Sequence, residues 1–512
     1  MASHEAGMAL AASEHDGKDV ATLEAEFAPM LENVKRAFRT GKTKSLEWRI
    51  GQLKALRKGL ADNSDAVIAA MKVDLGRHAM EAVLAEMASV FMEIDHVVDN
   101  LEDWMKPKSV SHPLMVQPGS SQIMYDPKGV VLILPPWNYP INLSIMSLVS
   151  VICAGNAAVI KPSEVAVESG KVVEHIVTTY LDSDCIKCVQ GAVPETTALL
   201  NLRWDHIFYT GNGAVGRIVM KAASKHLTPV TLELGGKSPA YFDKSCNLSV
   251  SVKRLLAGKS MNNGQTCIAP DYVLLDKSIE KEFLKEIKKA IKAAYGSDLG
   301  SSSSWGRIIN ERHWDRITRL LDSSAHGGEV LTGGVEKSDR EQKLIPLTLV
   351  LNPQLDSQLM VEEIFGPILP IITVDGPDQA VEIITSREHP LALYCFASNQ
   401  EVVDKFTTET TSGGVCVNDA LFHIVNSNLP FGGVGSSGMG SYHGYYGFLE
   451  FSHQKAVMYR STWLDPGVRY PPFHDGQAGK LADMIKREPM SANTKKLIAA
   501  TAALGMVLLA KL

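Results

Sequence analysis

The feature that most constrains the fold is the alternation of short apolar runs with helical patterns in the middle of this 512-residue chain. Residues 129–134 and 157–160 have the pattern of buried strands, and residues 141–154 between them have the length and apolar content of a helix. Strands that are apolar on both faces are typical of a parallel sheet covered by helices on each side. The pattern therefore predicts an α/β fold, with a nucleotide-binding sheet as the leading candidate.

The same alternation continues to the end of the chain and predicts a second α/β domain, with a boundary near Glu233. In the first domain we expect further strands at 186–190 and 206–209 and helices at 164–181 and 213–225. In the second we expect strands at 230–234, 272–275, 367–374 and 393–397 and helices at 249–260, 279–295 and 378–386. Residues 23–75 have helical spacing and predict a helical layer before the first sheet.

Composition and cysteine spacing argue against a nucleic-acid partner, a disulfide framework and a metal site. The net charge of −6 and the isoelectric point near 6.2 leave no basic excess to neutralise phosphates, so a nucleic-acid partner is not expected. Seven cysteines, an odd number, do not form a disulfide framework and indicate a reducing compartment. Cys185 and Cys188 have C-x-x-C spacing, but they lie in a predicted strand without a second pair or a histidine cluster, so no metal site is predicted.

A glycine motif opens the helix expected at 213–225. Residues 211–216 match G-x-G-x-x-G after a strand, the context of dinucleotide binding, with Gly211 and Gly216 at its ends. An acidic residue about 20 positions further on would bind a ribose, and Glu233 stands there. Glu233 also ends an apolar strand, where burial would raise its pKa toward the range of a general base. A salt-bridged packing residue is the alternative.

One cysteine has the surroundings of a nucleophile. Cys267 follows a small, polar turn at 261–266 that contains Gly264, and it precedes an expected strand. A thiol on such a turn faces substrate and backbone N–H groups together, which nucleophilic catalysis requires. A lone cysteine is more often a small buried residue, and the local sequence leaves both interpretations open.

Five short motifs together resemble the aldehyde dehydrogenase superfamily. They are Pro-Trp-Asn-Tyr-Pro at 136–140, Lys-Pro-Ser-Glu at 161–164, Glu-Leu-Gly-Gly-Lys-Ser-Pro at 233–239, Gly-Gln-Thr-Cys at 264–267 and Glu-Glu-Ile-Phe-Gly-Pro at 362–367. Their order and intervals are also similar, over roughly residues 31–472. Residues 226–234, 430–435 and 438–444 resemble class 3 of this superfamily, and the apolar C-terminal tail is similar to that of its fatty aldehyde members.

The resemblance implies a division of catalytic roles. Cys267 would attack the aldehyde carbonyl, the Asn138 side chain and the backbone N–H of Cys267 would hold the oxyanion, and Glu233 would activate water to hydrolyse the thioester. Without the motif, Asn138 would be read as a turn residue. His423, His443 and His453 could line the substrate mouth, but they are interpreted as surface or subunit-contact residues.

The resemblance also implies the cofactor, NAD, with NADP as a possible alternative. Lys161 and Glu164 would bind the adenosine ribose, Glu363 the nicotinamide ribose, and Phe365 would lie beside the nicotinamide. Gly211 and the helix that contains Gly216 would face the pyrophosphate. The charged residues could also be solvated loop positions, because Lys-Pro-Ser-Glu is a common helix start. A carboxylate at Glu164 favours NAD, since it would repel a 2′-phosphate.

With the family in view, the expected architecture is a Rossmann-like cofactor domain, an α/β catalytic domain and a small oligomerisation element. The predicted parts are a loose arm at 1–22, an NAD(P)-binding domain at 23–106 and 125–232, a catalytic domain at 233–418, an oligomerisation element at 107–124 and 419–463, a C-terminal extension at 464–494 and a hydrophobic tail at 495–512. A homodimer is expected from the resemblance. The polar stretch at 107–124 cannot pack alone, so it is expected to pair with another element.

The predicted function is NAD(P)-dependent oxidation of medium- or long-chain aldehydes to carboxylic acids. The alternatives are a CoA-acylating relative and an idle structural or binding protein that keeps the fold. Residues 497–510 are uncharged and, as a helix, would cover about 21 Å, against roughly 30 Å for a bilayer's hydrocarbon core. We therefore expect the cytosolic face of an intracellular membrane, such as the endoplasmic reticulum, or the cytoplasm. A helix packed over a partner subunit is the alternative for this tail.

Overall fold

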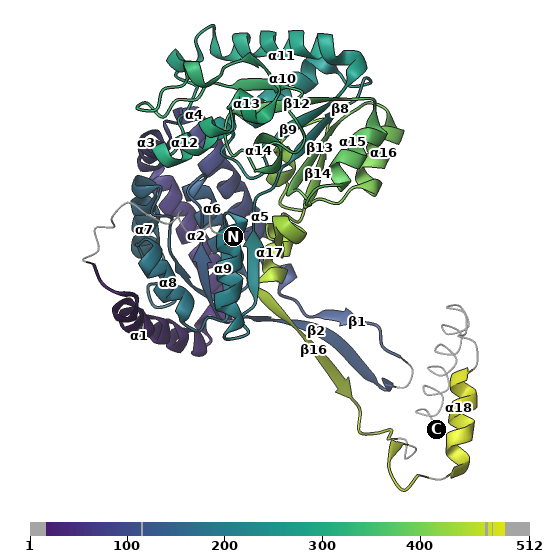
Figure 1. Cartoon of the computed structure of the whole chain (residues 1–512). Helices are drawn as coiled ribbons and strands as arrows, with labels where there is room; N and C mark the ends of the chain where they lie inside the picture. The colour runs from purple at the N-terminus through teal and green to yellow at the C-terminus, as the bar shows by residue number, and fades with distance from the viewer. Residues whose placement is uncertain (1–16, 114–115, 466–468, 474, 487–512) are drawn as a thin grey trace. The chain divides into compact units, whose positions relative to one another are not determined.

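The computed structural model of the protein describes residues 17–113, 116–465, 469–473 and 475–486, and Figure 1 traces them along the chain. The chain divides into two compact units. The first contains Met1–Trp104 and Asp126–His453, and the second contains Met105–Tyr125 and Gln454–Leu512. Both α/β sheets lie in the first unit, as do residues 419–453, which the sequence analysis joins to the stretch at 107–124.

The predicted helical layer is present at the N-terminal side of the first unit. It consists of α1 (Val20–Arg39), α2 (Leu46–Asp62), α3 (Ser64–Leu75), α4 (Ala79–Ala82), a π-helical turn η3 (Val83–Ala88) and α5 (Ser89–Trp104). The Asp19 and Ser45 side chains cap α1 and α2 by accepting backbone N–H groups. Leu53, Leu56 and Leu60, the predicted apolar face of α2, are fully buried.

The first sheet has six strands in the order β15-β7-β6-β3-β4-β5, and only β15 is antiparallel to its neighbour. The strands are β3 (Val130–Leu134), β4 (Ala157–Ile160), β5 (Ile186–Cys188), β6 (His206–Thr210), β7 (Val230–Glu233) and β15 (Gly438–Met439). The helices are α6 (Pro140–Cys153), α7 (Val167–Tyr180), α8 (Val193–Asn201) and α9 (Gly213–Ser224). Every residue of β3, β4 and β6 is buried, as the apolar runs predicted.

The predicted start of one helix beside this sheet is wrong. Helix α7 begins at Val167 and not at 164, because the chain first makes a turn after Pro162. The carboxylate of Asp74 then accepts the backbone N–H groups of Glu168 and Ser169 at 3.3 and 2.9 Å, which fixes the start of the helix.

The strand order creates a switch point between β3 and β6. From β3 the chain proceeds outward through β4 and β5, and from β6 it proceeds in the opposite direction to β7. Ligands of open α/β sheets bind at the carboxyl ends of the strands where the order reverses. Asn138 follows β3 and Gly211 follows β6, so both lie at this edge.

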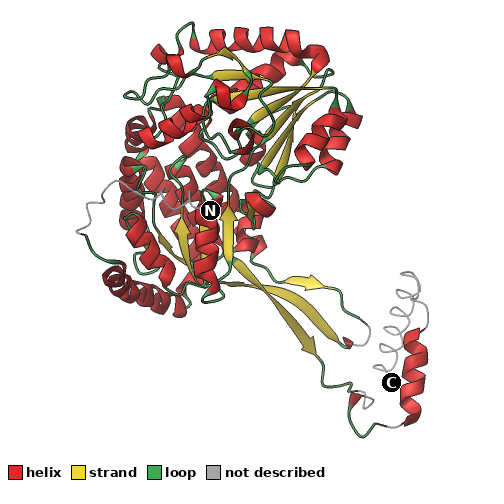
Figure 2. Cartoon of the chain, in the orientation of Figure 1, coloured by secondary structure: helices red, strands yellow, loops and turns green. Residues whose placement is uncertain are grey.

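The second sheet has seven strands in the order β10-β11-β12-β9-β8-β13-β14, and β10 alone is antiparallel to its neighbour. The strands are β8 (Pro239–Phe242), β9 (Tyr272–Asp276), β10 (Glu329–Thr332), β11 (Thr348–Leu351), β12 (Ile368–Val374), β13 (Ala392–Phe396) and β14 (Gly414–Val417). Its long helices are α10 (Leu248–Ser260), α11 (Glu280–Tyr295), α12 (Glu311–Arg319), α15 (Pro377–Thr385) and α16 (Gln400–Glu409), and shorter ones are α13 (Ser323–His326) and α14 (Gln358–Val361). The short helix α17 (Gly444–Glu450) instead packs against α5 and α6. Figure 2 shows helices flanking these strands.

The second unit contains a three-stranded sheet, β1 (Lys108–Val110), β2 (Gly119–Pro127) and β16 (Ser452–Arg460), and the helix α18 (Asp475–Lys486). The polar stretch at 107–124 thus pairs with other strands, as predicted. No helix in the described part of the chain is long and apolar enough to cross a bilayer. The hydrophobic tail at 495–512 lies outside the described residues.

Candidate active site

The loop before Cys267 has an unusual backbone. In the short helical segment η5 (Met261–Gly264), Asn262, Asn263 and Gly264 have φ values of 51°, 54° and 72°. Left-handed asparagines cost of order 1 kcal/mol or more each, so the surroundings must hold them. Asn262 donates to the carbonyls of Gln265 and Asn138, at 3.0 and 2.9 Å. A Cβ on Gly264 would collide with the carbonyl of Gly366.

The Cys267 thiol lies at the end of this loop. Cys267 is partly exposed, whereas its neighbours on both sides are buried. Burial, followed by the charges of Glu363 and Glu233, raises the pKa of the thiol to about 12. The backbone N–H groups of Cys267 and Ile268 act in the opposite direction. The thiol is therefore protonated at neutral pH in this arrangement, and the nucleophilic thiolate requires a proton acceptor or a positive charge near it.

The side chain of Asn138 lies beside this loop. It is buried, and its Nδ2 donates to the carbonyl of Gln265 at 3.0 Å. An amide nitrogen carries two hydrogens, so one donor remains for a second acceptor. The hydroxyl of Tyr139 is 2.7 Å from Oγ1 of Thr266, which ties the same turn to the residue before Cys267.

Glu233 ends β7 and is buried, as its position in an apolar strand predicted. Neither carboxylate oxygen has a hydrogen-bond partner among the described residues. The alternative that Glu233 is a salt-bridged packing residue is therefore wrong for the described part of the chain. Burial, followed by the nearby charge of Glu450, raises the pKa of Glu233 well above its usual value. An unpartnered buried carboxyl of this kind has the properties of a general base.

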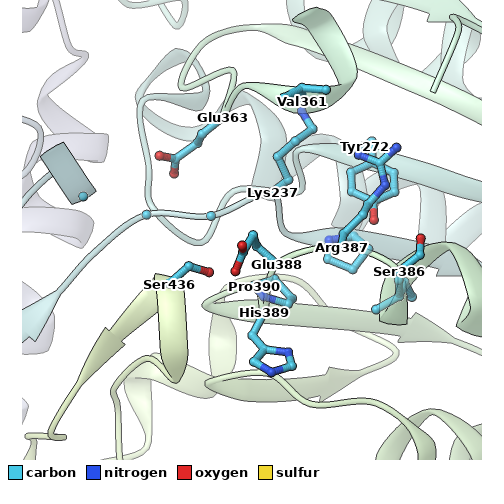
Figure 3. A pocket seen from close by; sticks show the side chains of 15 residues that line it. Lys237, Tyr272, Val361, Glu363, Ser386, Arg387, Glu388, His389, Pro390 and Ser436 are labelled. Atoms are coloured by element: carbon cyan, nitrogen blue, oxygen red, sulfur yellow. The ribbon is translucent and has the colours of Figure 1, made fainter. Parts of the chain in front are cut away.

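A cleft of about 620 Å³ lies between the first glycine of α9 and the loops that precede β8, β12 and β13. Figure 3 shows Glu363 in this cleft, and a Cβ on Gly235 would collide with its Oε2. Oε1 of Glu363 is enclosed without a partner, and the backbone N–H of Gly236 bonds to this carboxylate. Burial, followed by the charge of Asp271, raises the pKa of Glu363 to about 8. The free acceptor in a cleft fits a ribose hydroxyl.

Lys161 and Glu164 lie at the carboxyl end of β4. The Nζ of Lys161 donates to the carbonyls of Pro162 and Gly191 at 3.0 and 2.7 Å and to Glu164 at 3.1 Å. All three donors of the ammonium are thus in use, and the partly exposed Glu164 keeps acceptor capacity for a sugar hydroxyl.

A candidate nucleophile, an amide donor, a buried carboxyl and a cleft are thus present in the described part of the chain. The family model described as the aldehyde dehydrogenase family matches residues 16–457. The chain belongs to the aldehyde dehydrogenase family.

Two known aldehyde dehydrogenases and one solved structure show how similar this chain is to other members of the family. The dimeric NADP-preferring aldehyde dehydrogenase of Rattus norvegicus is 44% identical over 446 residues, covering 86% of this chain and 97% of the relative. Aldehyde dehydrogenase family 3 member A2 of Macaca fascicularis is 44% identical over 444 residues, covering 86% and 90%. The substrate-bound Staphylococcus aureus AldH has a TM-score of 0.85 and 38% identity, covering 90% of this chain and 99% of that one.

Three further positions were expected to contact the cofactor, namely Phe365, Gly211 and Gly216, and their contacts in the structure differ. The ring of Phe365, a residue with a φ of 47°, lies edge-on to Trp137 at 5.4 Å, next to Asn138. The N–H of Gly211 donates to the backbone carbonyl of Glu233 at 2.9 Å, so it is not free for a phosphate. Gly216 faces Leu234, and a Cβ there would touch that side chain, so Gly216 lets α9 pack closely.

Two interpretations of histidine and cysteine residues can be compared with the structure. His443 is buried and donates to the carbonyl of Ile424, so its placement at the surface is wrong, whereas His453 is exposed. Cys185 is buried and Cys188 lies on β5. The described part of the chain contains no cluster of three or more His, Cys, Asp or Glu side chains that could hold a metal ion.

Motif reasoning missed Arg77 and Glu86, which come from the helical layer and contact the turn of Asn138. A charged pair in an otherwise helical segment gives no sign of its target, because only the fold brings residues 77 and 138 together. The only sign of them in the sequence is that Arg77 and Glu86 are charged residues within a segment that also contains apolar positions.

Gly235→Ala is expected to weaken binding of NADH about tenfold or more, because the new Cβ would overlap Oε2 of Glu363 and displace that flexible carboxylate. Fluorescence titration with NADH measures the effect. Gly51→Ala is the matched control, since a Cβ at that position of α2 meets no atom within 4 Å. Unchanged NADH affinity in Gly235→Ala would show that Glu363 does not hold the cofactor.

Proposed function

We propose that this chain oxidises medium- and long-chain aliphatic aldehydes to carboxylic acids with NAD(P)+. The single observation that carries the proposal is the grouping of a partly exposed Cys267, the Asn138 amide beside its loop and the unpartnered buried Glu233. The fit of the cleft to the cofactor rests on the enclosed free oxygen of Glu363 and on Gly235, whose missing side chain leaves room for it.

In the acylation half, the Cys267 thiol gives up its proton to a water molecule, and the resulting thiolate attacks the aldehyde carbonyl and forms a thiohemiacetal. The second hydrogen of the Asn138 amide and the backbone N–H of Cys267 bind the oxyanion, and a preorganised donor of this kind is worth about 3–4 kcal/mol. When bound in the cleft, NAD(P)+ supplies the hydride acceptor that turns this adduct into a thioester. Glu363 and Glu164 would hold its two riboses, and Lys161, which donates to Glu164 at 3.1 Å, would orient that carboxylate.

In the deacylation half, Glu233 takes a proton from water, and the resulting hydroxide attacks the thioester carbonyl. The acid leaves and the thiol of Cys267 is regenerated. A carboxyl with a raised pKa is a stronger base once ionised than an ordinary glutamate, so its burial serves this step. A role in water activation favours hydrolysis over transfer to a thiol such as CoA, and the presence of all three groups disfavours an idle protein.

A series of straight-chain aldehydes assayed with both NAD+ and NADP+ tests the substrate class. Each further methylene that the enzyme buries contributes about 0.8 kcal/mol, so kcat/KM should rise roughly fourfold per carbon until the substrate site is filled. A series that stays flat or falls with chain length would overturn the fatty substrate while leaving aldehyde oxidation intact. The Rattus norvegicus relative, whose name calls it NADP-preferring, motivates the comparison of cofactors.

We further propose a homodimer. The support is the name of the Rattus norvegicus relative, which calls that enzyme dimeric, together with the small sheet β1-β2-β16 of the second unit, a separate structure with polar and exposed strands. Light scattering on a sizing column would give the mass of two 55.6 kDa chains.

Deletion of residues 495–512 is expected to move the enzyme from the membrane pellet to the supernatant, because an uncharged run of about 14 residues preceded by two lysines suits attachment to a membrane surface. The proposed place is the cytosolic face of an intracellular membrane, or the cytoplasm when detached. Fractionation of cells that express each form measures it, with activity as the control for folding. Equal pelleting of both forms would contradict anchoring.

A further inference from the structure

A buried arginine connects the two halves of the active site. Arg77 lies between α3 and α4, and its side chain is fully enclosed. Its Nε donates to Oδ1 of Asn262 at 3.0 Å, and its Nη2 donates to the backbone carbonyl of Asn138. The guanidinium also lies over the ring of Tyr139, 4.4 Å from its centroid. One planar group therefore contacts the turn that carries the amide donor and the loop that carries the nucleophile.

Glu86 holds this arginine and continues the connection. One carboxylate oxygen accepts from Nη1 of Arg77, and the other accepts the backbone N–H groups of Ile141 and Asn142, at 3.1 and 2.8 Å. Glu86 lies in the π-helical turn η3, a rare geometry that often occurs where a helix serves a functional site. The first turn of α6, which follows Asn138, is thereby fixed to the same charge pair.

A second acidic residue extends the contact to the cysteine loop. Glu81 accepts the backbone N–H of Asn262 at 2.6 Å, and its Oε1 is 3.8 Å from Nε of Arg77. Asn262 has a left-handed backbone and is buried, so its orientation depends on these partners. The segment 77–86 thus bonds to both the turn at 138–142 and the loop at 261–265.

We propose that Arg77, held by Glu86, is a positioning residue that fixes the Asn138 amide against the Cys267 loop for oxyanion stabilisation. This inference rests on the proposed function, in which Asn138 donates to the oxyanion. An arginine suits the task because its rigid fork sets the angle between its acceptors. Oxyanion donors act only when preorganised, and a displacement of about 1 Å can cost roughly a hundredfold in rate.

The test begins with Arg77→Met combined with Glu86→Gln. Glutamine keeps an acceptor for the N–H groups of Ile141 and Asn142 and leaves no unpaired buried charge, so the double variant is expected to fold. We expect kcat to fall about a hundredfold. The same loss is expected for cofactor-free hydrolysis of p-nitrophenyl acetate, which forms an oxyanion at the same thiol. NADH affinity from fluorescence titration should stay within about twofold.

Two further variants separate positioning from general stability. Arg77→Lys keeps a cation at this place but loses the planar fork, so its loss of kcat should be intermediate, roughly tenfold. Arg57→Met is the matched control, because Arg57 forms an exposed two-point pair with Asp95 in the same helical layer and also lies over an aromatic ring, that of Phe91. The control should keep kcat unchanged. Equal losses in the Arg57 and Arg77 variants would overturn the inference.

A double-mutant cycle with Asn138→Ala decides the matter. If Arg77 acts through the Asn138 amide, removing the Arg77–Glu86 pair in the Asn138→Ala background should lower kcat less than about threefold. A full hundredfold loss in that background would overturn the positioning role and leave the proposed function standing. Unchanged kcat in Asn138→Ala alone would instead refute the oxyanion role of Asn138, and with it the proposed function of this residue.

Discussion

Replacing Cys267 by serine is expected to lower aldehyde-dependent NADH production by roughly a thousandfold or more, since the hydroxyl is a far weaker nucleophile than a thiolate and no other residue replaces its covalent role. The loop before it, with three left-handed residues and a dense set of amide contacts, should accept the change of one atom without rearrangement. Initial-rate assays with a fatty aldehyde and NAD+ measure the loss.

Cys246→Ser is the matched control for this substitution, because Cys246 is also partly exposed but follows β8, away from the cysteine loop. It should retain the parent rate. Thiol labelling gives a second comparison: with its pKa near 12, Cys267 should react slowly with iodoacetamide at neutral pH and faster as the pH rises. Undiminished activity in Cys267→Ser would refute the covalent mechanism.

Glu233→Gln is expected to separate the two halves of the reaction. Acylation should still release NADH, giving a burst of about one equivalent per active site, whereas the steady-state rate should fall roughly 10²- to 10⁴-fold because no base activates the hydrolytic water. Stopped-flow absorbance resolves the burst, and mass spectrometry of the quenched enzyme should find the acyl group on Cys267. The pair of observations identifies hydrolysis as the blocked step.

The pH dependence follows from the same residue. A general base works only when deprotonated, and burial raises the pKa of Glu233 well above its usual value. Hydrolysis of the thioester in the parent enzyme should therefore decline as the pH falls through this raised pKa, at a higher pH than for an ordinary glutamate. The decline should be missing in Glu233→Gln. Glu450→Gln, which removes the nearby charge, should shift the decline to lower pH.

Strands with a buried apolar run in the regular strand–helix alternation could be predicted from the sequence, whereas the others could not. The runs of β3, β4, β6 and β12 were located to within about a residue. The strands β8 and β11, which follow another strand without an α-helix between them, and β10 and β14, which have no buried residue, were missed. Their place in the sheet depends on neighbours that are distant in sequence.

Some residues of the candidate site could likewise be predicted from the sequence, whereas others could not. The resemblance selected Cys267, Asn138 and Glu233, and the structure brings the first two into one hydrogen-bonded unit with the charge of the third acting on the thiol. The contributions of Arg77 and Glu86 could not be read from the sequence, because their hydrogen bonds cross between segments about 60 and 185 residues apart. Whether each cofactor residue has its expected role remains a prediction.

The covalent path from one large sheet to the other has a consequence for the order of events. Residues 233–239 connect the end of β7 directly to the start of β8, and they carry in succession the base, the glycine under Glu363 and Lys237, which is anchored to Asp271 at 2.6 Å. A movement of one sheet relative to the other would therefore act on the proposed base through this short segment. Cofactor exchange and thioester hydrolysis would then depend on the conformation of the same seven residues, 233–239.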